Sequence, residues 1–242
     1  MMEEGRYTPP EAVEMSLSLP TELVSEQDLA QFWLTFRRNN DIAVSDTARE
    51  ERSASIQAKQ TKRELEKNKS IHFFGIKAGE KMVATGKLET YEDDEGIKRA
   101  YLSLLTVDPE YRGKNVAKDI TDARVETAQK LGCEYVHAHV FTGNPIALTT
   151  KLKEGYFVKE LEIDKESPDS GGFIVSKRIN GEIEHDKKDG PLGELKEVEL
   201  SDLSTIKSLL DDGWIGIDAK NLGDSKDKDP KQWKLIMEQA KK

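Results

Sequence analysis

The sequence is poor in features that mark several protein classes. Its 242 residues include one cysteine, Cys133, which excludes an intrachain disulfide and suits a reducing compartment. No apolar run approaches the roughly 18 residues of a membrane-spanning helix. Residues 1–10 contain Glu and Pro in place of a basic and then apolar leader. We therefore expect a cytoplasmic protein that is not inserted in a membrane.

Positive charge is also scarce relative to negative charge. The chain has 37 Lys and Arg against 46 Asp and Glu, a formal net charge of −9. This balance disfavours nonspecific binding to nucleic acid or to an anionic membrane, and it suits a cationic amine as a partner. Apolar residues make up 36% of the chain, which is enough for one core of roughly 150 to 180 residues with an appendage.

The most informative segment is Val107–Ala117, which reads as the end of a strand, a turn and the start of a helix. Val107 ends an apolar run, and Pro109 cannot continue a strand ladder. The residues from Arg112 to Asn115 carry no acidic side chain, and backbone N–H groups at such a helix start bind phosphate well. A basic turn before a surface helix is the alternative interpretation of this segment alone.

A second segment supports the phosphate interpretation. With Asn144, Ala147, Gly155 and Tyr156 at their spacing, the two segments together resemble the acetyl-coenzyme A signature of the GNAT superfamily of N-acetyltransferases. The resemblance implies an α/β fold of the mixed type, in which a mostly antiparallel sheet is flanked by helices. It also implies binding of acetyl-CoA and transfer of its acetyl group to an amine.

The loop of that signature has Gln or Arg, any two residues, Gly, any residue, and then Gly or Ala. Arg112 and Ala117 fit this pattern, but Asn115 stands where the middle Gly is usual. Asn takes unusual backbone angles better than other non-glycine residues, and it is also a good helix N-cap. We therefore expect the cradle of backbone amides to survive the change.

The predicted elements occur in the order that the resemblance implies. Helices are expected at Glu26–Arg38, from the N-cap Asp46 to Lys69, and at Asn115–Leu131 and Asn144–Lys153. Strands are expected at Glu14–Leu19, Ile71–Lys77, Lys81–Tyr91, Ala100–Val107, Glu134–Phe141, Tyr156–Ile163 and Gly172–Ile179. In the middle helix, apolar spacing of three and four predicts a buried stripe of Val116, Ile120, Ala123, Thr127 and Leu131.

Residues 1–180 are expected to form the acetyl-CoA-binding domain. Beyond it, Gly181–Gly193 is polar and rich in glycine, and reads as a linker. Residues 194–242 are expected to form a small helical extension, with Lys231–Lys241 as a docking helix. The strand and helix pattern at the start of this extension leaves a degenerate repeat of a GNAT domain start as another possibility.

The resemblance assigns the coenzyme to particular residues. Main-chain groups at a strand bulge, the phosphate loop and a later loop would hold it: Leu105, Thr106, Val107, Arg112, Gly113, Lys114, Asn115, Val116, Ala117 and Asn144. No metal site is expected. Many family members use a tyrosine to return a proton to the departing thiolate, and at its position this chain has Lys151. Protonation by Lys151, by Tyr156 or by water stays open.

Two residues are candidates for the base that accepts the amine proton. A primary amine has a pKa near 10, so a base worth about 10²-fold in rate is useful. His139 is the first candidate, because it shares a strand face with His137 and lies nearest to the expected opening between the central strands. Glu89 is the second. The alternatives are a partly buried, hydrogen-bonded histidine and an exposed surface glutamate.

Two interpretations of the function remain open. The first is an acetyl-CoA-dependent N-acetyltransferase, monomeric or homodimeric, that acts by direct attack of a primary amine on the thioester. Its acceptor would be a small molecule or a protein. The second is a noncatalytic acyl-CoA-binding module or an interaction protein.

Overall fold

The computed structural model describes residues 17–40, 47–164, 171–180, 194–223 and 229–239. The strands are β1 (Thr21–Glu22), β2 (Ile71–Ala78), β3 (Lys81–Glu92), β4 (Lys98–Val107), β5 (Tyr135–Phe141), β6 (Phe157–Ile163), β7 (Gly171–Arg178), β8 (Leu195–Glu199), β9 (Trp214–Asn221) and β10 (Trp233–Gln239). The helices are α1 (Glu26–Asn39), α2 (Thr47–Lys67), α3 (Val116–Lys130), α4 (Pro145–Lys153) and α5 (Leu203–Asp211), with short 3-10 turns η1 (Pro109–Tyr111) and η2 (Pro230–Gln232).

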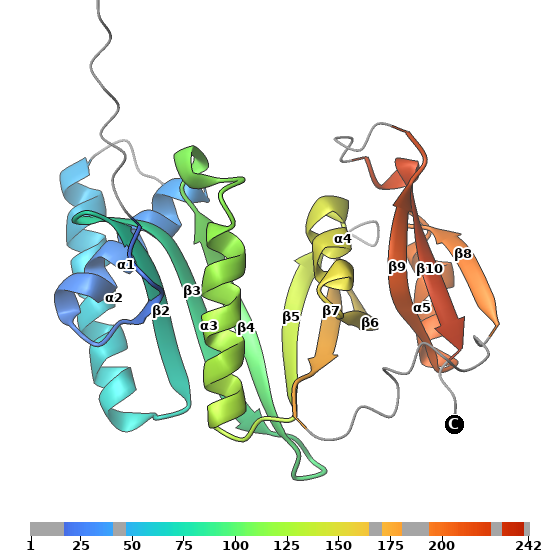
Figure 1. Cartoon of the computed structure of the whole chain (residues 1–242), viewed down its shortest axis with the longest axis horizontal. Helices are drawn as coiled ribbons and strands as arrows, with labels where there is room; N and C mark the ends of the chain where they lie inside the picture. Colours follow the sequence, from blue (N-terminus) through green and yellow to red (C-terminus); the bar gives the residue numbers. More distant parts are fainter. Residues whose placement is uncertain (1–16, 41–46, 165–170, 181–193, 224–228, 240–242) are drawn as a thin grey trace, which may run out of the picture.

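The strands form one sheet in the order β1-β2-β3-β4-β5-β7-β6-β9-β10-β8 (Figure 1). Among the strand pairs of the described residues, only β4 and β5 run parallel. The expected fold class, a mixed and mostly antiparallel sheet flanked by helices, is confirmed. The helices and strands predicted from Glu26 to Ile179 agree with the observed ones to within two residues at each end. The strand expected at Glu14–Leu19 is wrong in its described part, because only Leu17 pairs there, in an isolated bridge with Ala78, and β1 begins at Thr21.

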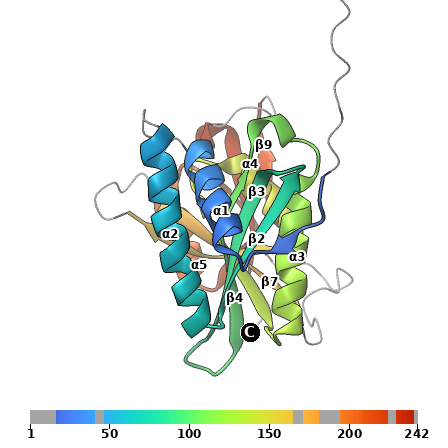
Figure 2. The same cartoon turned by 90° about the vertical axis from the view of Figure 1, so that its left-hand side faces the viewer.

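The N-terminal half of the sheet is covered on both faces, with α1 and α2 on one face and α3 on the other (Figure 2). Helix α1 begins at Ser25, whose hydroxyl accepts a hydrogen bond from the N–H of Asp28 at 3.0 Å. It buries Phe32 edge-on against Phe73 of β2, with ring centroids 4.9 Å apart. Burial of such a ring stabilises the fold by about 1.5–3 kcal/mol. Strands β2 to β4 are thereby fixed between two apolar layers.

Residues 194–239 continue the sheet instead of forming a helical extension. Strand β9 joins β6 through the pair Val158 and Gly216, and β10 and β8 follow outward. The predicted docking helix Lys231–Lys241 is wrong, because Trp233–Gln239 form strand β10. Its buried side chains are Trp233, Leu235, Ile236 and Met237. A strand buried on both faces gives a short continuous apolar run, which sequence periodicity does not distinguish from a buried helix.

The extension shares a hydrophobic core with the central strands and α3, whereas α1 and α2 pack on a second, separate cluster of buried residues. Val198, Ile206 and Leu235 belong to the same cluster of buried residues as Val136 of β5. The first strand of the extension is paired differently from the first described strand of the chain. Strand β1 pairs with β2, the strand that follows its helices, whereas β8 pairs with β10 and not with β9, the strand that follows α5. The degenerate repeat and the three-part division of the chain stay predictions, and the linker Gly181–Gly193 lies outside the described residues.

Candidate functional site

Strand β4 carries a bulge near its carboxyl end. Ser103 faces Lys87 of β3, and the next pair is Thr106 with Thr85, so two residues of β4 lie opposite one of β3. The first of these two, Leu104, has a φ of 52°. A residue in the left-handed region is typical of a bulge of this kind, and a leucine there is uncommon. The bulge expected at the end of this strand is confirmed.

Beyond the paired part of the central sheet, β4 and β5 separate. Their parallel pairing begins at Arg99 and ends at the pair Leu102 and Ala138. Strand β4 then follows β3 as far as Val107, while β5 follows β7 as far as Phe141. The carboxyl ends of two adjacent parallel strands therefore diverge and leave an opening between them. In open α/β sheets ligands bind at such an edge.

Exposed apolar side chains surround this opening. Leu105 at the bulge is 39% exposed, Phe141 at the end of β5 is 70% exposed, and Ile146 in the first turn of α4 is 37% exposed. Apolar groups near a strand end that face solvent, and not the core, suit contact with a long flexible ligand. From the sequence, only main-chain contacts are predicted for Leu105, and Phe141 and Ile146 are not among the predicted site residues. The sequence signal that could have identified Phe141 is its position as an apolar residue at the end of a predicted strand.

The predicted phosphate loop, Arg112–Ala117, contains two residues whose backbone lies in the left-handed region. Gly113 has a φ of 76° and Asn115 a φ of 62°. Asn115 is the N-cap residue of α3, but its side chain makes no capping hydrogen bond with the described residues. The expectation that Asn115 tolerates glycine-like angles is confirmed, and the expectation of a side-chain cap is wrong. The amides of the first turn of α3 consequently remain without a cap from this side chain, as an anion site requires.

The side chains of this loop differ in their contacts and in their burial. The guanidinium Nε of Arg112 donates to the carbonyl of Val107 at 3.2 Å, so the side chain folds back along the end of β4. The ammonium of Lys114 lies 5.1 Å from the centre of the Tyr111 ring. Val116 is buried in the core, whereas the residues from Arg112 to Asn115 are exposed. Val116 can thus contribute only its main chain to a ligand.

Asn144, the last residue expected to contact the coenzyme, is the N-cap of α4. Its side-chain oxygen accepts a hydrogen bond from the N–H of Ala147 at 3.1 Å. The carboxamide therefore fixes the start of the helix beside the opening. Its contact with the coenzyme stays a prediction.

His139 directly follows Ala138, the last residue of β5 that pairs with β4, and it lines a pocket of about 380 Å³. The pocket is lined by His139, Phe141, Thr142, Gly143, Glu162, Ile163, Asp164, Gly171 and Gly172. The imidazole Nε2 is 3.8 Å from a carboxylate oxygen of Glu162. The ring rests directly on Gly172, where a Cβ atom would lie only 1.7 Å from Nε2. A residue without a side chain is required at that position for the histidine to keep its place.

Glu89 lies elsewhere. It is on β3, opposite Tyr101 of β4, and its carboxylate accepts from the ammonium of Lys87 at 2.8 Å. Strands β3 and β5 are separated by β4, which places their backbones about 9–10 Å apart. The structure thus brings His139, but not Glu89, to the pocket at the opening.

His137 is the other histidine on this face of β5, and it is buried. Burial, together with the nearby charge of Arg99, lowers its pKa to about 4. The guanidinium of Arg99 lies 3.4 Å from the Nε2 atom of His137. His137 is therefore neutral at pH 7, and its environment opposes the uptake of a proton.

Lys151 is largely buried, with 13% of its side chain exposed. Its ammonium donates to a carboxylate oxygen of Glu154 at 2.6 Å and lies 4.9 Å from the centre of the Tyr156 ring. Burial lowers the pKa of Lys151, and the hydrogen bond to Glu154 opposes that shift. Burial raises the pKa of Tyr156. The two shifts make the lysine a better proton donor, and the tyrosine a poorer one, than either would be in water.

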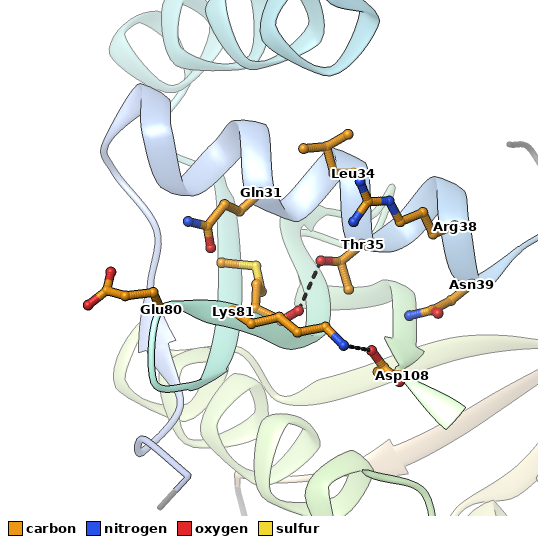
Figure 3. A pocket seen from close by; sticks show the side chains of 9 residues that line it. Gln31, Leu34, Thr35, Arg38, Asn39, Glu80, Lys81 and Asp108 are labelled. Atoms are coloured by element: carbon orange, nitrogen blue, oxygen red, sulfur yellow. Dashed lines mark hydrogen bonds and ion pairs between the residues drawn. The ribbon is translucent and has the colours of Figure 1, made fainter. Parts of the chain in front are cut away.

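A second pocket lies between α1, the start of β3 and Asp108 (Figure 3). It measures about 240 Å³ and is lined by Gln31, Leu34, Thr35, Arg38, Asn39, Glu80, Lys81, Met82 and Asp108. The ammonium of Lys81 lies 2.7 Å from a carboxylate oxygen of Asp108 at its edge. Asp108 also accepts from the N–H of Glu110 at 3.2 Å and so begins η1. This ion pair connects the pocket to the loop that precedes α3.

Comparison with known proteins agrees with this geometry. The acetyltransferase (GNAT) family model matches residues 31–150. No curated protein sequence matches the chain. No helix in the described part of the chain has the length and apolar character needed to span a membrane.

Solved structures share the fold at low sequence identity. An acetyltransferase of the GNAT family from Streptococcus pneumoniae is 13% identical, with a TM-score of 0.54 over 68% of this chain and 100% of its own. The NatC complex bound to Gag peptide and CoA contains a chain that is 15% identical, with a TM-score of 0.52 over 69% of this chain and 100% of its own. A GNAT-family protein from Desulfovibrio desulfuricans is 12% identical, with a TM-score of 0.51 over 68% and 100%.

These likenesses show the fold, and the family match covers the bulge, the phosphate loop and α4 as far as residue 150. The bulge, the diverging strands and the open helix start all lie within or beside the matched region. Residues 31–150 of this chain form a domain of the acetyltransferase (GNAT) family.

Proposed function

We propose that this protein is an acetyl-CoA-dependent N-acetyltransferase that acetylates a primary amine of a small molecule or of a protein. One observation carries the proposal. Strands β4 and β5 diverge after Leu102 and Ala138, beside the bulge at Leu104 and above the exposed start of α3. This arrangement offers a slot for the thioester arm and an anion site for the pyrophosphate at the same edge of the sheet.

The coenzyme is held mainly by the main chain in this proposal. The amides of Leu105 to Val107 face the thioester arm, and one of them polarises its carbonyl. The segment Arg112–Ala117 holds the pyrophosphate, with Lys114 at its edge, and Asn144 contacts the arm from the side of α4. Support comes from the left-handed angles of Gly113 and Asn115, which turn successive N–H groups toward one point.

His139 is the proposed general base. The neutral amine attacks the carbonyl carbon of the thioester while His139 accepts a proton from the nitrogen. The C–N bond forms, the C–S bond breaks, and the electron pair leaves with the sulfur. Glu162, 3.8 Å from the imidazole, stabilises the resulting imidazolium. Glu89 is not needed in this scheme, because it lies on the far side of β4.

Lys151 is the proposed donor to the departing thiolate. The buried position of Lys151 favours release of a proton from its ammonium group. The carboxylate of Glu154 accepts a 2.6 Å hydrogen bond from the same group and holds it in place. Solvent then returns a proton from His139 to Lys151, and the site is restored. The family's usual tyrosine is thereby replaced by a desolvated lysine.

The acceptor pocket favours a cationic amine. Of the residues that line it, two are acidic, Glu162 and Asp164, and none is Lys or Arg. The exposed ring of Phe141 at its edge adds a face that attracts an ammonium group. We further propose a cytoplasmic location, a monomeric or homodimeric state, and residues 1–180 as the acetyl-CoA-binding part.

One observation favours a different function. The ion pair of Lys151 with Glu154 also suits a purely structural role, in which case the protein would bind acyl-CoA without catalysis. Two measurements separate the proposals: calorimetry with CoA, and thiol release from acetyl-CoA across a panel of primary amines. We expect binding of CoA and amine-stimulated release. Binding without release by any amine would favour the noncatalytic module, and absence of binding would reject both.

A further inference from the structure

Arg124 of α3 is the largest side chain in the described part of the chain that is fully buried, with 1% exposure. It forms no ion pair with any described residue, which is unusual because a buried charge is costly unless it is compensated. Burial lowers its pKa to about 10. A leucine would serve simple packing at this position on the buried face of α3. The guanidinium must therefore be held by a specific set of acceptors.

Those acceptors are concentrated at the bulge of β4. The Nη1 atom donates to the carbonyl of Lys87 on β3 at 3.2 Å and to the carbonyl of Ser103 on β4 at 3.1 Å. Ser103 is the residue that directly precedes the left-handed Leu104, and Lys87 is its partner across the strands. One guanidinium nitrogen thus ties β3 to β4 at the point where their regular pairing is interrupted.

The rest of the guanidinium is anchored to α3 itself. Nε donates to the carbonyl of Ile120, and Nη2 donates to the hydroxyl of Thr121, each at 3.2 Å. The side chain therefore forms a rigid connection between the helix that begins at the phosphate loop and the bulge beside the opening.

Gly86 makes room for this connection. It is the residue of β3 that lies opposite the two bulge residues of β4. A Cβ atom at this glycine would lie 3.0 Å from the Nε, Cζ and Nη1 atoms of Arg124. Because the guanidinium is held on its other sides, it has little freedom to move away.

We infer that Arg124 is a positioning residue, which fixes the main chain of Leu104 and Leu105 in the shape that presents an amide to the thioester carbonyl. The inference rests on the proposed function, since it concerns the same bulge. Its effect is transmitted through two carbonyl groups, and Arg124 itself touches neither the acyl group nor the amine. Loss of the connection should lower kcat for acetyl transfer and leave binding of CoA, which has no acyl carbonyl, almost unchanged.

The test uses the full-length variants R124K and G86A, with I120V as a matched control that removes a methyl group from the same buried helix face. We expect kcat to fall about tenfold or more in R124K and G86A, because a displaced donor loses much of its transition-state interaction. The Kd for CoA should change less than about threefold, and I120V should keep its kcat. Equal loss of kcat in I120V, or an unchanged kcat in folded R124K and G86A, would overturn the inference.

Amide hydrogen exchange at Leu105 and Thr106 provides a readout that does not depend on turnover. We expect faster exchange at these amides in R124K and G86A, but not in I120V, while exchange in β7 stays the same. If the wild-type protein binds CoA but acetylates no amine, the proposed enzyme function fails, and the exchange data still decide the role of Arg124. Unaltered exchange at the bulge in both variants would reject that role. G86A keeps the test informative if R124K does not fold.

Discussion

The two sides of the candidate site are built from different parts of the chain. On the coenzyme side the essential features are backbone angles, such as the φ of 52° at Leu104, 76° at Gly113 and 62° at Asn115. On the acceptor side they are side chains in fixed places, chiefly His139 resting on Gly172 and facing Glu162. A site made of main-chain groups tolerates side-chain changes that keep the backbone path. A site made of side chains depends on their identity and on the few neighbours that hold them.

This difference predicts where substitutions matter. On the acceptor side, loss of one functional group should abolish most of the activity without changing coenzyme binding. On the coenzyme side, a change of backbone preference should weaken binding, while most changes of exposed side chains should have little effect.

The largest effect is expected for H139A. Turnover near pH 7 should fall about 10²-fold, because the amine loses its base. The deficit should shrink as the pH rises, since hydroxide can then accept the proton that the attacking amine loses. Steady-state kinetics from pH 6 to 10 measures both effects. The matched variant E89Q should lose less than about threefold, and an equal loss in E89Q or an unaltered pH profile in H139A would remove His139 from its proposed role.

The second largest effect is expected for G113V, on the coenzyme side. The left-handed angle of Gly113 costs a β-branched residue about 1–2 kcal/mol, so the loop shifts and the Kd for CoA rises about 5- to 30-fold. A Cβ at this glycine meets no atom within 4 Å, so the effect cannot come from a clash. Calorimetry with CoA measures it. N115G, which restores the usual family residue, serves as the control and should bind CoA at least as well as the wild type.

R112E tests the charge of the same loop by a different route. The reversed charge should weaken CoA binding about tenfold at low ionic strength and less in high salt, because exposed charges are screened. Calorimetry at two salt concentrations measures this dependence. Affinity equal to that of the wild type at low salt would exclude a phosphate site at Arg112–Ala117.

A smaller effect is expected for K151M. Lys151 is the proposed proton donor to the departing thiolate, which lies between the coenzyme side and the acceptor side of the site. A thiolate leaves readily without full protonation, so kcat should fall only about tenfold, and the Kd for CoA should stay the same. Because Lys151 must be protonated to donate, the rate that depends on it falls as the pH rises through its lowered pKa. K151M should lack this alkaline decline. K151R keeps the positive charge but does not release a proton, and it should behave like K151M in the pH profile.

The smallest effect is expected for D108N, at the junction between the phosphate loop and the pocket of Figure 3. Partial burial raises the pKa of Asp108, but the hydrogen bonds from Lys81 and from the N–H of Glu110 together lower it by more than burial raises it. The pKa of Asp108 is therefore below its usual value. Its stabilising contribution is therefore present above its unfolded pKa and is lost as the pH falls through the lower folded value. Denaturant unfolding should show D108N less stable by up to about 1 kcal/mol at pH 7, because the ion pair with Lys81 is lost, and equal to the wild type near pH 2. A deficit that persists at pH 2 would contradict this assignment.

The comparison of the two sides also explains what could be predicted from the sequence. The phosphate loop was recognisable because Arg112, Asn115 and Ala117 are close together in the chain and act through a local backbone path. The pocket around His139 depends on Gly172, 33 positions later in the sequence, and on the register that places it opposite Phe141. No local pattern contains that register.

Two errors have the same physical origin. Of the predicted stripe of α3, Val116 and Ile120 are buried and Ala123 and Leu131 pack partly buried against the core, but the buried residues Thr121, Arg124 and Ala128 are missing from it. A charged residue in a helical pattern is normally assigned to the exposed face, so Arg124 was not considered. Likewise, the apolar run in β10 predicts a helix from the sequence, because the run itself does not contain its strand partners β8 and β9. In both cases the missing information was the neighbour.

The sequence by itself determined the family resemblance, the limits of most helices and strands, and the turn at Arg112–Asn115 that begins α3, because these depend on periodicity, turn residues and local backbone preference. The tertiary structure alone decided three other features: the side chains that meet His139, the carbonyl groups that hold Arg124, and the continuation of the sheet beyond residue 194. Each of these is a contact between segments far apart in the chain. Such contacts are set by strand register and packing, which only the folded chain specifies.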